Sequence, residues 1–267
     1  MQLLVSVRSP VEVEPALRGG ADILDAKEPA RGSLGAVSPD VLGGIVARIP
    51  PQVQLSIALG DLFTLEDVWQ AIEHLPDLTG RARIYLKLGF AGVRSFERVR
   101  ALLEVAADAA RSHPASPSIV AVAYADSEFA GTIPPRSVFR AAAGVPASGV
   151  LLDTYLKSEG NLFTWIEPSE LTGLMVRAHG TGMLAAVAGS LTVEHLKPVC
   201  AAGADIVGVR GAACSEGREG AVCLSKVRQL RDQLRLVSSA FVPGQTKEVA
   251  GLARETPEDS ANLWPIP

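Results

Sequence analysis

The chain has 267 residues, a formal net charge of −4 and 48% hydrophobic residues, a size that suits two small domains or one barrel-sized domain. The slightly acidic balance gives no reason to expect nucleic acid or an anionic membrane as a partner. No apolar run reaches the roughly 18 residues of a membrane span. The three cysteines show no CxxC spacing, so neither a disulfide framework nor a metal site is predicted, and without a secretory signal we expect a cytoplasmic protein.

Short aliphatic runs alternate with longer segments of helical periodicity along most of the chain. Eight strands are predicted, at residues 3–7, 21–28, 54–61, 83–90, 119–126, 149–155, 182–189 and 205–212. The predicted helices are residues 10–18, 38–48, 64–74, 95–112, 135–143, 162–179, 192–202 and 221–238. Several of these helices follow a serine or threonine and several end at glycine, which are favoured residues at helix ends.

The predicted strands are nearly continuous in their apolar character, which indicates burial on both faces, as in a parallel sheet covered by helices. Eight strand–helix units in a chain of this size favour an α/β fold of the closed (β/α)₈ TIM barrel type. An open doubly wound sheet is the alternative. We expect residues 1–241 to form the barrel. Residues 242–267, rich in proline and charge, are expected to form a C-terminal extension.

Charged residues stand at the ends of three predicted strands. Asp25 and Lys27 close the second strand, Lys87 lies at the end of the fourth, and Asp153 and Lys157 lie at and after the end of the sixth. Because the carboxyl ends of barrel strands face the catalytic mouth, these five side chains can converge. The alternative is that each lysine keeps its stem on apolar surface and its ammonium group in water.

A lysine nucleophile must be unprotonated near neutral pH, so the pKa of Lys27 would have to fall by about three units from roughly 10.4. Neighbouring ammonium groups and a dry barrel mouth both act in that direction. An ionised Asp25 would oppose this lowering of the lysine pKa, so the expected role of Asp25 is to orient a group or to move protons. The pattern therefore predicts lysine chemistry on carbonyl compounds.

Small residues follow the last two predicted strands. Gly189, Ser190 and Gly211 expose backbone amides there, and Arg210 adds a cation, so a phosphate group can bind at this position. Glycine turns also close many barrels without binding anything. Taken with the lysines, the pattern predicts a phosphorylated carbonyl substrate.

Two further aspartates, Asp61 and Asp126, end the third and fifth predicted strands. Each can bind a hydroxyl group or accept a proton, and each can equally cap the helix that follows. The histidines fall in or after helices of the outer ring, where solvated or capping roles are expected. They are His74, His113, His179 and His195.

Several segments resemble one enzyme family, the (5-formylfuran-3-yl)methyl phosphate synthases of methanofuran biosynthesis, also called 4-HFC-P synthases. The segments are GGADILDAKEPARGSLGA (19–36), IYLKLGF (84–90), LLDTYLKSEGNLF (151–163), LAAVAGSL (184–191) and DIVGVRGAAC (205–214). The stretch DxKxPxxGSLGA is a specific match. The similarity covers nearly the whole predicted barrel and does not cover the C-terminal residues.

The resemblance implies a lyase that joins two molecules of glyceraldehyde 3-phosphate into a furan, with loss of one phosphate and two waters and with no metal or organic cofactor. Lys27 matches the Schiff-base lysine of the family and Lys87 the lysine that transfers a proton, while Asp25, Asp153 and Lys157 match further active-site positions. Two alternatives stay open, namely another Schiff-base aldolase acting on phosphorylated sugars and a non-catalytic sugar-phosphate sensor. The oligomeric state is also open, a homo-oligomer included.

Overall fold

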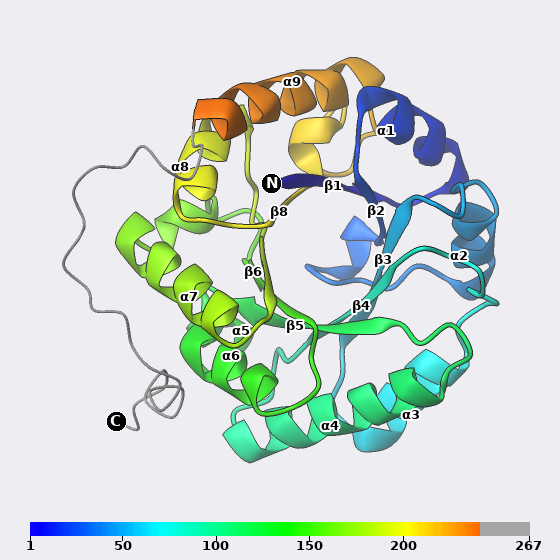
Figure 1. The fold of residues 1–267 in the computed structure, drawn as a ribbon, viewed down its shortest axis with the longest axis vertical. Coiled ribbons are helices and arrows are strands. Elements are labelled where there is room, and N and C mark those ends of the chain that lie inside the picture. Colours follow the sequence, from blue (N-terminus) through cyan, green and yellow to red (C-terminus); the bar gives the residue numbers. More distant parts are fainter. Residues whose placement is uncertain (241–267) are drawn as a thin grey trace.

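The structure is a computed structural model that describes residues 1–240. Within these residues eight parallel strands close into a barrel in chain order, and helices surround it (Figure 1). The strands are β1 Gln2–Val7, β2 Ile23–Ala26, β3 Gln54–Asp61, β4 Ile84–Gly89, β5 Ser118–Tyr124, β6 Gly149–Asp153, β7 Leu184–Val187 and β8 Ile206–Val209. The predicted (β/α)₈ barrel is thus confirmed, and the predicted extension, 242–267, lies outside the described residues.

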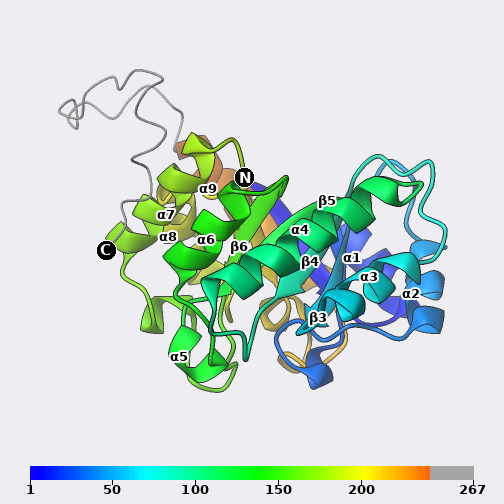
Figure 2. The ribbon, with the colours of Figure 1, turned by 90° about the horizontal axis from the view of Figure 1, so that it is seen from below.

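Helices follow the strands and cover the outside of the barrel (Figures 1 and 2). The α-helices are α1 Val13–Gly19, α2 Pro39–Val46, α3 Leu65–Glu73, α4 Phe96–Ser112, α5 Ser127–Ala130, α6 Pro135–Ala143, α7 Pro168–Gly180, α8 Leu196–Ala201 and α9 Leu224–Ala240. Single 3-10 turns are η1 Pro10–Glu12, η2 Pro29–Arg31, η3 Leu162–Thr164, η4 Val193–His195 and η5 Gly211–Ala213.

The helix predicted over 162–179 is in fact two pieces, η3 and α7. Pro168 opens α7, and Glu167 before it has an extended backbone, as the residue preceding a proline prefers. Proline fits the first turn of a helix because its missing amide has no partner there in any case. The short helix α5 was not predicted, because a single turn is too brief to show helical periodicity.

Successive residues of each strand pack into two different clusters. Residues such as Leu24 and Leu55 belong to the main core between the barrel and the helices, whereas Ile23 and Tyr85 belong to a cluster inside the barrel. This division follows from the alternation of side chains along a strand. Small residues stand at inward positions of β7 and β8, at Ala186 and Gly208, and both border an internal cavity.

The loop after β2, residues 27–36, crosses the mouth of the barrel. Its Leu34 is 1% exposed and packs in the cluster inside the barrel. The loop turns tightly at Gly35. A larger residue would not fit there, because a Cβ atom would lie 2.3 Å from the carbonyl oxygen of Glu28. The loop and α5 both lie at the end of the barrel to which the strands point (Figure 2).

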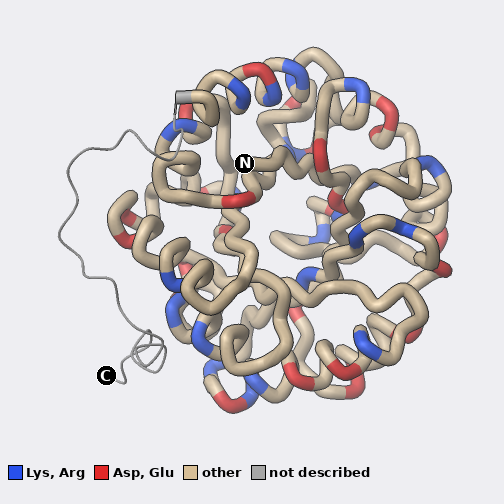
Figure 3. Tube along the Cα trace, in the orientation of Figure 1, with Lys and Arg blue, Asp and Glu red and all other residues tan. Residues whose placement is uncertain are grey.

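Positively and negatively charged residues are interspersed along the outer helices (Figure 3). None of the described helices is both long and apolar enough to cross a membrane. The three cysteines, Cys200, Cys214 and Cys223, are unpaired.

Candidate active site

A cavity of about 290 Å³ opens at the carboxyl ends of the strands and extends into the barrel. Its deeper wall is apolar and includes Leu4, Val120, Leu184 and Ile206. Its upper wall carries all five charged residues that the strand ends predicted, which are Asp25, Lys27, Lys87, Asp153 and Lys157. The sequence therefore places these residues correctly around one space, although Lys87 lies within β4 rather than at its end.

Asp25 and Lys87 form a buried ion pair, with 2.7 Å between Oδ1 of Asp25 and Nζ of Lys87. Ser6 on the neighbouring strand β1 donates a hydrogen bond of 2.8 Å to the other carboxylate oxygen. Burial by itself would raise the pKa of Asp25, but the ammonium groups of Lys87 and Lys27 outweigh it and hold the pKa below its usual value. Asp25 is therefore a stable anion on the cavity wall.

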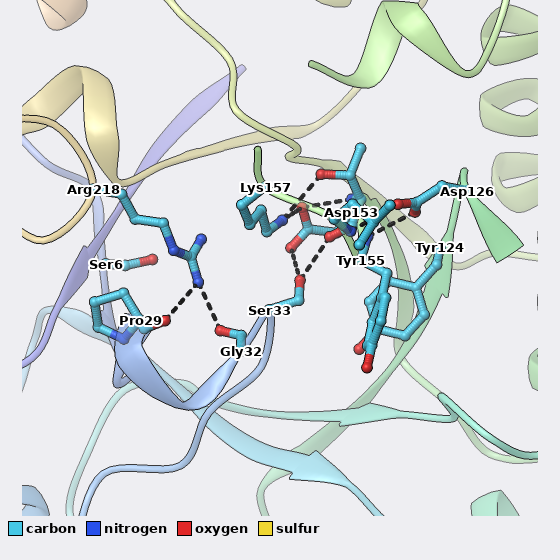
Figure 4. A network of polar contacts seen from close by, with 12 residues as sticks. Ser6, Pro29, Gly32, Ser33, Tyr124, Asp126, Asp153, Tyr155, Lys157 and Arg218 are labelled. Carbon is cyan, nitrogen blue, oxygen red and sulfur yellow. Dashed lines mark hydrogen bonds and ion pairs between the residues drawn. The ribbon is translucent and has the colours of Figure 1, made fainter. Parts of the chain in front are cut away.

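Asp153 and Lys157 form a second pair, with Nζ 2.5 Å from Oδ1. The amide of Thr154 donates to the same oxygen at 2.8 Å, and Ser33 of the loop after β2 donates to Oδ2 at 3.2 Å (Figure 4). Burial would raise the pKa of Asp153, yet Lys157 and then Lys27 lower it to about 2. Burial also lowers the pKa of Lys157, against the attraction of Asp153.

Lys27 borders the same cavity as both pairs but belongs to neither. It is 6% exposed, and its ammonium group donates no hydrogen bond to any described residue. Burial lowers its pKa to about 7, and the charges of Lys87 and Lys157 add to this effect, while Asp153 and Asp25 oppose it. Near neutral pH a large fraction of Lys27 is consequently a neutral amine, which is the form that attacks carbonyl carbon.

Arg210 does not have the predicted role of a free cation for phosphate. It is 5% exposed, and all five of its N–H groups are used. Two donate to Glu12 at 2.6 and 3.0 Å, and the others to the carbonyl oxygens of Ser6, Arg218 and Gly220. A guanidinium group has five donors and no more, so Arg210 joins the end of β8 to η1 and has no donor left for a ligand.

Arg218, in the loop between η5 and α9, also borders the cavity, as Arg210 does. Its Nη2 donates to the carbonyl oxygens of Pro29 and Gly32 at 3.2 and 2.6 Å (Figure 4). Its Nε and Nη1 donate to no acceptor in the described part of the chain. Sequence reasoning missed Arg218 because it stands in an irregular loop, nine residues after the end of β8, and only the folded chain brings it across the mouth.

The turn after β7 offers backbone amides. Gly189 and Ser190 have φ angles of +113° and +50°, and both border the cavity with Gly211. Within residues 1–240, the amides of Gly189, Ser190 and Leu191 donate to no protein acceptor. Consecutive amides freed by left-handed backbone form a concave site for anions.

Asp61 and Asp126 hold loops rather than facing the cavity. Asp61 accepts hydrogen bonds from the amide of Ala91 at 2.9 Å and the hydroxyl of Tyr124 at 2.8 Å. Asp126 accepts from the amides of Tyr155 and the residue after it, at 2.6 and 2.7 Å. Neither aspartate borders the cavity. The structure thus favours a non-catalytic role for both aspartates. Each anchors a loop, whereas the non-catalytic role predicted from the sequence was to cap a helix.

The geometry defines a (β/α)₈-barrel protein with a lysine- and aspartate-lined cavity at the carboxyl ends of its strands, where enzymes of this fold carry their active sites. Residues 3–231 match the family described as 4-HFC-P synthase. The chain belongs to this family, as the resemblance of its motifs indicated.

Several relatives carry the name (5-formylfuran-3-yl)methyl phosphate synthase, and two of them show the extent of the match. The protein of Methanothermobacter thermautotrophicus is 34% identical, over 88% of this chain and 99% of its own length. That of Methanopyrus kandleri is 35% identical, over 87% of this chain and 98% of its own length. Because these matches span almost the whole of each relative, the chain resembles a named synthase throughout the barrel.

Solved structures show the same fold at low sequence identity. Phosphoribosyl anthranilate isomerase from Thermus thermophilus has a TM-score of 0.56 at 15% identity, covering 89% of this chain and all of its own. 3-Hexulose-6-phosphate synthase from Salmonella typhimurium has a TM-score of 0.56 at 14% identity with the same coverage. These likenesses support the barrel and nothing finer.

Proposed function

We propose that this protein is a carbon–oxygen lyase that makes (5-formylfuran-3-yl)methyl phosphate from two molecules of glyceraldehyde 3-phosphate in methanofuran-type cofactor biosynthesis. One phosphate and two waters leave. The observation that carries the proposal is Lys27, a buried amine with a pKa of about 7 beside two lysine–aspartate pairs. The names of the relatives support the product.

In the first step, the neutral amine of Lys27 adds to the aldehyde carbon of one triose phosphate. The resulting carbinolamine loses its hydroxyl group as water, and an iminium ion remains. Departure of water needs a proton, which the ammonium group of Lys87 supplies. Lys87 is then a neutral amine, and Asp25 at 2.7 Å keeps it in place.

In the second step, the iminium ion acidifies the adjacent C2–H bond, and Lys87 takes that proton to give an enamine. The enamine carbon attacks the aldehyde carbon of the second triose phosphate and forms the new carbon–carbon bond. Asp153 and Lys157 border the same cavity, and they serve the later eliminations as base and acid. The iminium nitrogen of Lys27 accepts the electron pair in these steps, so no metal or organic cofactor is part of the proposal.

The substrate phosphates need cations or amide donors near the mouth. We assign this role to the turn at Gly189 and Ser190, to the neighbouring Gly211, and to the unused donors of Arg218. Charge-assisted hydrogen bonds from a guanidinium group are well suited to phosphate oxygens. Arg210 is left out because Glu12 and three carbonyl oxygens already use its donors.

The test combines trapping with turnover. The protein is incubated with glyceraldehyde 3-phosphate and cyanoborohydride, which reduces an iminium ion to a stable amine, and the adduct is located by peptide mass spectrometry. A parallel sample without reductant is assayed for free phosphate and furan absorbance. The variant Lys27→Met should lose both signals, and the variant Lys197→Met, at an exposed lysine, should keep them.

The outcomes separate the competing functions. An adduct on Lys27 with furan and phosphate released supports the synthase. An adduct without furan indicates another Schiff-base aldolase. Binding of triose phosphate without any adduct overturns lysine catalysis and favours a sugar-phosphate sensor.

A further inference from the structure

Two polar atoms on the cavity wall lack a directed hydrogen bond. One is the hydroxyl oxygen of Ser56, a residue of β3 that is 1% exposed, and the other is Oδ1 of Asp25, a fully buried residue. Oδ1 has the ammonium group of Lys87 2.7 Å away, but that contact is an ion pair without hydrogen-bond geometry. Buried polar groups are nearly always hydrogen-bonded, so two atoms on a cavity wall without a well-formed hydrogen bond indicate a place for a ligand group.

The strand register explains why these atoms lie together. Asp25 stands opposite Ser6 on β1 and opposite Ser56 on β3, so one carboxylate lies between two serines. Ser6 donates to Oδ2 at 2.8 Å and is satisfied. A hydrogen-bonding interaction of the Ser56 side chain helps to lower the pKa of Asp25, yet the contact does not have the geometry of a well-formed hydrogen bond.

We infer that Ser56 and Oδ1 of Asp25 form a subsite for a ligand hydroxyl group. The ligand hydroxyl donates to Oδ1 and accepts from the Ser56 hydroxyl, which satisfies both atoms at once. In the reaction proposed above, on which this assignment rests, the group is the 2-hydroxyl of the triose attached to Lys27. That hydroxyl stands on the carbon from which Lys87 takes a proton. Ser56 is therefore a specificity-determining residue that selects a 2-hydroxyaldehyde over a 2-deoxy compound.

The test compares glyceraldehyde 3-phosphate with 3-oxopropyl phosphate, which has the aldehyde and the phosphate but no 2-hydroxyl. Rates of cyanoborohydride trapping at Lys27 are measured for both compounds with the wild type, Ser56→Ala and Ser6→Ala. The preference of the wild type for the hydroxylated compound should fall about 3- to 10-fold in Ser56→Ala, the usual effect of one neutral hydrogen bond. Ser6→Ala, the matched control, should change both rates by the same factor.

A uniform loss of both rates in Ser56→Ala would assign this residue a structural role only and would overturn the inference. Unchanged rates would also overturn it, since they would mean that a water molecule occupies the subsite throughout. If the wild type forms no adduct at Lys27, the proposed function fails separately. In that case the affinities of Lys27→Met and Lys27→Met/Ser56→Ala for the two compounds, measured by calorimetry, decide whether the hydroxyl subsite exists.

Discussion

Ser33 and Asp153 are 120 residues apart in the chain, and the hydroxyl of Ser33 donates a hydrogen bond of 3.2 Å to the carboxylate of Asp153 (Figure 4). The same hydroxyl is 2.8 Å from the carbonyl oxygen of Thr154. The loop after β2 is thereby attached to the end of β6 on the other side of the mouth. One serine thus couples a catalytic candidate to the loop that covers it.

Replacing Ser33 by Ala should loosen this loop without unfolding the barrel. We expect a loss of about 1 kcal/mol in the free energy of unfolding and faster amide hydrogen exchange within residues 28–36. The KM for triose phosphate should rise more than kcat falls, because the loop crosses the mouth of the cavity that we propose as the substrate site. Exchange measured by mass spectrometry checks the prediction, and protection of the loop equal to that of the wild type would contradict it.

Lys27→Met should abolish adduct formation and stabilise the fold near neutral pH. The pKa of Lys27 is about 7 in the folded protein against 10.5 as the ordinary value. The unfolded chain therefore binds the proton more tightly. Burying the charged form of Lys27 lowers the free energy of unfolding, and this loss is fully present below pH 7 and fades as the pH rises toward 10.5. We expect the variant to be more stable by about 2 to 5 kcal/mol at pH 6.5.

Urea unfolding of both proteins at pH 6.5 and pH 9.5 measures this effect. The advantage of Lys27→Met should shrink at the higher pH. An advantage that does not depend on pH would mean that packing, rather than the buried charge, is responsible.

The reactivity of Lys27 should also report its pKa directly. Trapping by cyanoborohydride needs the neutral amine, so its rate should rise with pH and reach half of its maximum near pH 7. Lys197, which is exposed, is the internal comparison. Peptide mass spectrometry follows both lysines in one experiment, and equal pH profiles would show that Lys27 is not perturbed.

Arg210→Gln should destabilise the protein strongly. The change leaves Glu12, which is 3% exposed, as a buried carboxylate without its hydrogen-bonded cation, and the nearest guanidinium group is then that of Arg8 at 4.0 Å. Removing one partner of such a pair costs about 3 to 5 kcal/mol. Thermal unfolding measures the effect, and a melting temperature close to that of the wild type would contradict the structural role assigned to Arg210.

Arg218→Gln should instead act mainly on substrate affinity. Its guanidinium group is half-buried and has unused donors at the cavity, so we expect the KM for triose phosphate to rise about 10-fold or more, in line with the loss of a charge-assisted hydrogen bond. Arg210→Gln is the contrasting variant. An unchanged KM in Arg218→Gln would remove this arginine from the proposed phosphate site.

The sequence predicts the barrel well because its signal is repetitive. Each strand is a short apolar run bounded by turn residues, and β3 and α6 have the predicted bounds. Asp25 and Lys27 could be placed on one face because side chains alternate along a strand. Lys157 could be placed near Asp153 because the two are four residues apart at a strand end.

Contacts between distant loops could not be predicted. Nothing local distinguishes Arg210 from Arg218, since both are arginines that follow β8. Glu12 decides between them by taking the donors of Arg210, and that contact joins residues 198 positions apart. Ser56 is equally inconspicuous in sequence, because a serine in a buried strand becomes informative only when its neighbours are known to leave it unpartnered.

The attachment of Arg218 to Pro29 and Gly32 has a consequence for synthesis of the chain on the ribosome. These contacts join residues 189 and 186 positions apart, and β1 needs β8 as a neighbour to close the barrel. A nascent chain that has emerged only through β7 lacks both the Arg218 contacts and the pairing of β8 with β1. Lys27 is made early, but the enclosed surroundings that lower its pKa form only when nearly the whole barrel has been translated. We therefore expect the amine that we propose as the nucleophile to keep its ordinary protonated form until the protein is almost finished.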